Sequence, residues 1–125
     1  MKLSDCENNG AINGRYSAGG IAQCIENKNS NEAEVSNCIN NGNVFGGAEA
    51  AGIIDYAEGI TVTNCINNGN ISSNGYVGGI FSYTSSVKGT GLVNNGKISG
   101  LEDIGGISAY DEGNSIFSKL YNTGV

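Results

Sequence analysis

The stretch that decides the fold is NCINNGNI, residues 64–71, because closely similar segments return along the chain. The related segments begin at four other places: CENNGAI at Cys6, CINNGNV at Cys38, LVNNGKI at Leu92 and LYNTGV at Leu120. The glycine that closes each copy recurs at steps of 32, 27, 27 and 28 residues, at Gly10, Gly42, Gly69, Gly96 and Gly124. A fixed period of this length is typical of stacked-repeat architectures.

A second landmark repeats in parallel with the first. It is a Gly-Ile pair that follows the closing glycine of the first four copies, with its glycine ten residues further on, at Gly20, Gly52, Gly79 and Gly106. Because this spacing is constant, the extra length of the first unit must lie elsewhere. We interpret the polar segment at residues 28–34 as a loop insertion.

The composition of the unit favours β-structure. Gly, Asn, Ser and β-branched residues disfavour helix interiors. Each unit holds three short β-prone stretches, which in the third unit are residues 60–67, 69–72 and 76–83. We therefore predict an all-β parallel β-helix, or β-solenoid, of about four and a half three-sided coils of roughly 27 residues. The expected coils are residues 3–34, 35–61, 62–88, 89–115 and, in part, 116–125.

Stacking of the coils places equivalent residues in columns. Two branched aliphatic columns are predicted to form the core, namely Ile12, Val44, Ile71 and Ile98, and Ile21, Ile53, Ile80 and Ile107. Two asparagine columns run beside each other, and one of them is expected to form an inward ladder at a corner where Asn and Gly tolerate a left-handed backbone. The predicted structural ladder is Asn8, Asn40, Asn67, Asn94 and Asn122.

At these residues the chain resembles the GLUG-type repeats of bacterial cell-surface proteins. In that family a Gly-Gly-(Leu or Ile)-x-x-Tyr segment precedes an Asn-rich NxG-(Val or Ile) segment. The matching pieces cover essentially the whole chain and are GGIAQC at Gly19, AGIIDY at Ala51, GGIFSY at Gly78 and GGISAY at Gly105. The resemblance implies a right-handed β-helix in an extracellular surface protein of a Gram-positive or gut bacterium, acting as a passive stalk or an adhesive module.

Charge narrows the possible partners. Twelve acidic residues against six basic ones leave a net charge of −6, whereas nucleic-acid binding and anionic membranes both call for a basic surface. No apolar run approaches the roughly 18 residues of a membrane span. We expect no nucleic-acid partner and no membrane insertion in this segment. Since the chain starts and stops within a repeat, we expect a single domain, residues 1–125, excised from a longer protein that carries the signal and anchor.

The four cysteines do not form a metal-binding pattern, because there is no CxxC spacing and no His. Cys6, Cys38 and Cys65 share one column, in which neighbouring residues lie about 5 Å apart, within disulfide reach. Parallel stacking, however, points their β-carbons the same way. We therefore expect free, buried thiols that pack as small hydrophobic groups.

Tyr56, Tyr83 and Tyr110 form a further column, in which Cys24 holds the first position. If the rings point outward, they form an aromatic stripe suited to sugars or to a protein partner. If the rings point inward, they fill a corner, which is the interpretation we favour.

Carboxylates gather near the tyrosines, notably Asp55 with Glu58 and Asp111 with Glu112. Paired carboxylates serve glycoside cleavage or hold calcium in other proteins. We expect a solvated acidic face here.

The repeats are regular, and no coil carries the unusual polar residues that would mark an active site. The sequence therefore predicts a non-catalytic structural or adhesive module that binds a glycan or a protein, with no catalytic, cofactor-binding or metal-binding residues. The alternative is a fragment of a polysaccharide-processing β-helix enzyme or phage tail spike. Because the first and last coils leave backbone groups unpaired, end-to-end self-association is also expected.

Overall fold

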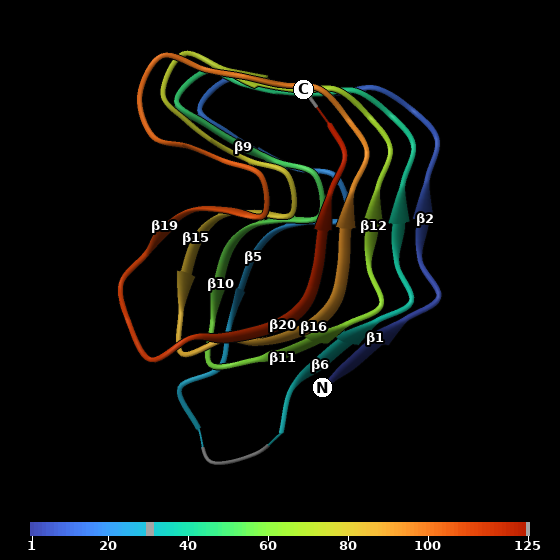
Figure 1. Ribbon diagram of the computed structural model, residues 1–125, viewed down its shortest axis with the longest axis vertical. Helices are drawn as coiled ribbons and strands as arrows, with labels where there is room; N and C mark the ends of the chain where they lie inside the picture. Colours follow the sequence, from blue (N-terminus) through green and yellow to red (C-terminus); the bar gives the residue numbers. More distant parts are fainter. Residues whose placement is uncertain (30–31, 125) are drawn as a thin grey trace.

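The protein is a parallel β-helix, as the sequence predicted. The computed structural model describes residues 1–29 and 32–124, and this part of the chain contains 20 β-strands and no helix. Every strand pairing is parallel and joins equivalent residues of successive coils. Figure 1 shows the coils lying one behind another with a similar outline.

The strands form four sheets. The largest sheet holds two strands from each of the first three coils and one continuous strand from each of the last two. These strands are β1 (Lys2–Ser4), β2 (Glu7–Asn8), β6 (Glu34–Ser36), β7 (Ile39–Asn40), β11 (Thr61–Thr63), β12 (Ile66–Asn67), β16 (Lys88–Asn94) and β20 (Ile116–Asn122). The next two sheets contain β3 (Ile12–Gly14), β8 (Val44–Gly46), β13 (Ile71–Ser73) and β17 (Ile98–Ser99), and β4 (Ser17–Gly19), β9 (Glu49–Ala51), β14 (Tyr76–Gly78) and β18 (Ile104–Gly105). The last contains β5 (Ala22–Glu26), β10 (Ile54–Glu58), β15 (Phe81–Ser85) and β19 (Ser108–Asp111).

The outline of each coil has an indentation that a simple three-sided outline would lack. In the first three coils the three β-prone stretches become five strands, because the first and the third stretch are each divided at a corner. Figure 1 shows the chain turning inward at β9, so that a notch separates two lobes. The tip of the notch carries the second glycine landmark, and a Cβ on Gly52 would lie only 2.4 Å from Cγ of Asn67. Glycine is required there because the chain passes directly against the asparagine ladder.

Each lobe has its own core. In the lobe bounded by β8, β9, β13 and β14, the buried residues include Val44 and Ile71, with Ile12 and Ile98 packed against them. The other lobe includes Ile53, Ile80 and Phe81. Both predicted aliphatic columns therefore lie in the core, and their middle members are fully or almost fully buried.

The left-handed backbone conformation does not occur at the corner where it was expected. The Asn-Asn-Gly segments do not adopt it. Instead, positive φ occurs at the residue before the cysteine column, as at Asn37 (φ 55°) and Asn64 (φ 53°), where the chain turns from the first strand to the second. It also occurs just after the last strand of a coil, at Gly59 (φ 68°) and Ser86 (φ 53°). The closing glycines serve close approach, because a Cβ on Gly69 would lie 1.9 Å from the carbonyl oxygen of Gly42.

The strand register also locates the insertion. Glu26 pairs with Glu58, and Glu34 pairs with Thr61, so the extra residues of the first unit lie between Glu26 and Glu34. Residues 30–31 of the predicted loop lie outside the described residues. Ala33, at the end of the loop, is buried against the core.

Candidate functional site

The inner asparagine column is a continuous hydrogen-bonded ladder. The side-chain amide of each Asn donates to the side-chain oxygen of the next, at 2.8 Å in all four steps from Asn8 to Asn122. In the first four rungs the same amide also donates to the carbonyl of the glycine two residues later, and the side-chain oxygen accepts from that glycine N–H. The middle rungs Asn40, Asn67 and Asn94 are fully buried. The predicted ladder is therefore structural and inward.

The neighbouring asparagine column forms a second ladder on the outside. Asn68 donates to Asn41 at 2.8 Å, and Asn41 donates to Asn9 at 2.8 Å. Its hydrogen bonds run toward the N-terminus, whereas those of the inner ladder run toward the C-terminus. Both side-chain columns thus reinforce the register that the parallel strands set.

The tyrosine column faces outward, so the corner-filling interpretation is wrong. Tyr56 and Tyr83 are half-buried, and Tyr110 is 47% exposed. The rings stack along the column, with centroids 4.5 Å apart between Tyr56 and Tyr83 and 5.5 Å apart between Tyr83 and Tyr110. Successive rings are nearly parallel, at 5° and 20°. Tyr83 therefore has a ring on each of its two faces.

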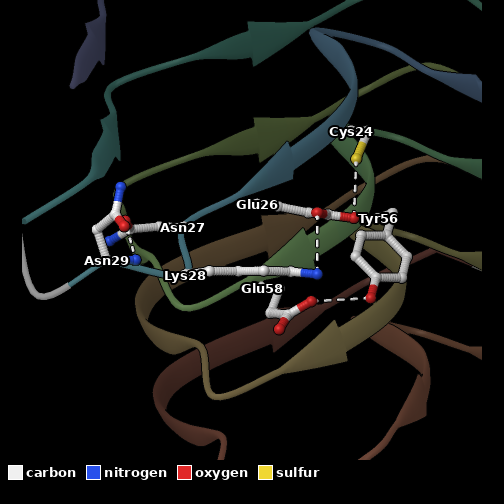
Figure 2. A network of polar contacts seen from close by, with 7 residues as sticks. All are labelled: Cys24, Glu26, Asn27, Lys28, Asn29, Tyr56 and Glu58. Carbon is white, nitrogen blue, oxygen red and sulfur yellow. Dashed lines mark hydrogen bonds and ion pairs between the residues drawn. The ribbon is translucent and has the colours of Figure 1, made fainter.

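Carboxylates fix the tyrosine hydroxyls. The Tyr56 hydroxyl donates to Glu58 at 2.9 Å, as Figure 2 shows, and the Tyr83 hydroxyl donates to Glu112. The hydrogen bond to Glu112 is the main reason that the pKa of Tyr83 lies above its usual value. Each ring is thereby held at its outer end as well as by its stacking neighbours.

Cys24 takes the place of a tyrosine in the first coil and is exposed, so the expectation of buried cysteines is wrong here. Its thiol lies 3.9 Å from Glu26, which pairs with Lys28 at 3.7 Å (Figure 2). Burial and the charge of Glu26 raise the pKa of the Cys24 thiol. It is therefore a protonated thiol at neutral pH.

The other three cysteines are free and line the core. Cys38 and Cys65 are fully buried, and Cys6 is half-buried at the first coil. Burial raises the pKa of Cys65 to about 12. These thiols pack as small hydrophobic groups, as predicted.

A groove of about 380 Å³ opens beside the tyrosine column and is lined by Glu49, Tyr56, Tyr76, Tyr83 and Tyr110. One wall comes from β10, β15 and β19. The opposite wall comes from β9 and β14, on the other side of the notch. The inward turn of the chain therefore creates a concave surface that a simple three-sided coil would lack.

Asp55, next to Tyr56 on β10, is an exception to the expected solvated acidic face, whereas Asp111 and Glu112 are exposed as expected. Asp55 is fully buried, and its Oδ1 accepts a hydrogen bond of 2.5 Å from Ser82. Among the described residues, its Oδ2 has no hydrogen-bond partner. Burial raises the pKa of Asp55 to about 6, and the charge of Glu49 adds to the rise. The hydrogen bond from Ser82 and the nearby polar side chains of Gln23 and Ser17 act in the opposite direction.

Within residues 1–29 and 32–124, no three His, Cys, Asp or Glu side chains are grouped so that they could hold a metal ion. The same residues form no helix long and apolar enough to cross a membrane. Comparisons with protein-family models, with curated proteins and with solved structures found no match to this chain. The tyrosine-lined groove, built from matching positions of three coils, is the candidate site that the structure itself supplies.

Proposed function

We propose that the chain is a non-catalytic structural and adhesive repeat module of a bacterial cell-surface protein, in a GLUG-type repeat region. Its adhesive surface is the tyrosine-lined groove, and its ligand is a glycan or a protein. The observation that carries this proposal is the outward tyrosine column, which repeats over three coils beside a concave surface. Aromatic side chains with one polar end are suited to recognition at wet surfaces.

The scaffold supports an adhesive role, because the groove needs no rearrangement to present its side chains. Stacking and hydrogen bonds to Glu58 and Glu112 hold the rings of Tyr56 and Tyr83 in place. A pre-formed surface loses little side-chain freedom when a ligand binds. The ladders behind it resist deformation of the stack.

A carbohydrate array combined with an assay for released product tests the proposal. We expect retention of a ligand without turnover, and loss of retention in Tyr83→Ala, with wild-type retention in Tyr16→Ala. Tyr16 is an exposed tyrosine outside the groove, so the pair separates groove binding from general aromatic stickiness. Equal loss in both variants would contradict the proposal.

One observation favours the second candidate, a fragment of a polysaccharide-processing β-helix enzyme or phage tail spike. Burial raises the pKa of Asp55 to about 6, and the charge of Glu49, which lines the groove, adds to the rise. Enzymes that cleave glycosides usually use a carboxylic acid with a raised pKa together with a second carboxylate. Product release that disappears in Asp55→Asn would favour this candidate over adhesion.

A further inference from the structure

The charged side chains at the groove are acidic. Its lining contains the carboxylate Glu49 and, among the described residues, no Lys or Arg. Glu58 and Glu112 lie at the tyrosine hydroxyls. A concave surface with carboxylates of one sign attracts cations and repels anions.

Asp55 adds a second, independent feature. Its carboxylate is fully buried, its Oδ2 has no hydrogen-bond partner among the described residues, and the charge of Glu49 contributes to the rise of its pKa. The charges of Asp55 and Glu49 therefore repel each other, and the groove lining supplies no Lys or Arg among the described residues to offset them. A cationic group at Glu49 would relieve this repulsion.

The stacking of the tyrosines determines what can lie against them. Both faces of the Tyr83 ring are covered by Tyr56 and Tyr110, so this ring presents its edge to the groove. A sugar normally stacks on an exposed ring face. Ring edges instead offer an apolar wall for a flexible hydrocarbon stem, such as the four methylenes of a lysine.

We propose that the groove binds a lysine side chain of a partner protein. The methylene stem lies along the edges of Tyr56 and Tyr83, and the ammonium group reaches Glu49. This inference rests on the proposed adhesive function and specifies its ligand class. Charge complementarity between the acidic groove and a basic segment selects the partner.

The test uses a hexalysine peptide and the same peptide with every side chain acetylated, titrated against the whole chain by calorimetry at physiological salt. We expect binding of hexalysine and at least about fivefold weaker binding of the acetylated peptide. Equal affinities would overturn the proposal, because acetylation keeps the stem and removes the charge.

A matched pair of variants separates the groove from general attraction by a protein of charge −6. Glu49→Gln should weaken hexalysine binding about fivefold. Glu32→Gln removes the same charge from an exposed residue outside the groove lining and should leave the affinity within twofold. Equal weakening in both variants would overturn the lysine site.

A neutral probe, cellohexaose, distinguishes failure of this inference from failure of the proposed function. Binding of cellohexaose that Tyr83→Ala abolishes, without groove-specific binding of hexalysine, would overturn the lysine ligand and retain groove adhesion. If neither probe binds and no array ligand is retained, both proposals fail.

Discussion

Asn40 donates a side-chain hydrogen bond of 2.8 Å to Asn67, and both side chains are fully buried. Each of these amides also bonds to both backbone groups of its own closing glycine. One side chain thus satisfies the corner of its own coil and links that coil to the next. The same asparagine therefore recurs once per repeat and stabilises the contact between successive coils.

We expect Asn67→Ala to be strongly destabilising. The substitution leaves the N–H and C=O of Gly69 without their side-chain partner and interrupts the ladder at both neighbours. Each buried polar group left unpaired costs about 1–3 kcal/mol, so a total loss of roughly 3–5 kcal/mol is expected. Denaturant-induced unfolding measures it. Asn68→Ala is the control, since water can replace its exposed hydrogen bonds and the expected cost is below about 1 kcal/mol; equal costs would contradict the structural ladder.

The closing glycines permit a second comparison within one column. Gly69→Ala would place a Cβ 1.9 Å from the carbonyl oxygen of Gly42, so the coils must separate and several kcal/mol of stability, roughly 3 or more, should be lost. Gly10→Ala is the matched control, because its Cβ would meet nothing nearer than 3.9 Å. Similar unfolding midpoints for the two variants would show that the coils are not packed as described.

We expect the reactivity of the four thiols to follow their burial. In the native protein we expect Cys24 to react with a thiol reagent first, since it is exposed, and Cys38 and Cys65 to react only after unfolding. Cys24→Ser should remove the fast phase. All four thiols should be recovered in denaturant without reductant; recovery of only two would indicate a disulfide and reject the free-thiol assignment.

Two aspartate substitutions at adjacent positions test which side chain of β13 is buried in the core. Ile71→Asp places a carboxylate in the core of its lobe, which costs several kcal/mol, about 3–5, when the charge has no partner. Ser72→Asp adds the same charge at a partly exposed position one residue away and should cost less than about 1 kcal/mol. Unfolding midpoints in denaturant compare them, and an unchanged midpoint in Ile71→Asp would refute the core assignment.

The columns could be predicted from the sequence because a constant period fixes the register. Asn67 and Ile71 keep their spacing in each unit, so their stacking follows without any knowledge of the coil outline. The direction of the tyrosines could not be predicted in this way. Ile54 and Ala57 both face the core, so strict alternation along β10 fails between them. Counting alternate residues from Ile54 points Tyr56 inward, whereas the structure places it outside.

The groove was missed for a related reason. The Gly-Ile landmark marks a corner, but Gly52 carries no side chain whose polarity could indicate that the corner turns inward. The burial of Asp55 depends on that inward turn, which brings Ser17 and Glu49 toward it. Its sequence neighbours suggested a solvated carboxylate, and only the tertiary arrangement removes it from water.

Asp55 makes stability depend on pH. Because the pKa of this carboxyl rises from 3.8 to about 6 on folding, the folded state binds its proton more tightly than the unfolded chain does. The stabilisation is complete below about pH 4 and is lost as the pH rises through about 6, by up to about 3 kcal/mol. Asp55→Asn should therefore raise stability at pH 7.5 and flatten this dependence, whereas Asp103→Asn, at an exposed position, should change neither. The measurement is the unfolding midpoint at pH 5 and at pH 7.5. We expect the midpoint to change more between these pH values for wild type than for Asp55→Asn. An equal change in both proteins would show that Asp55 is not the titrating group.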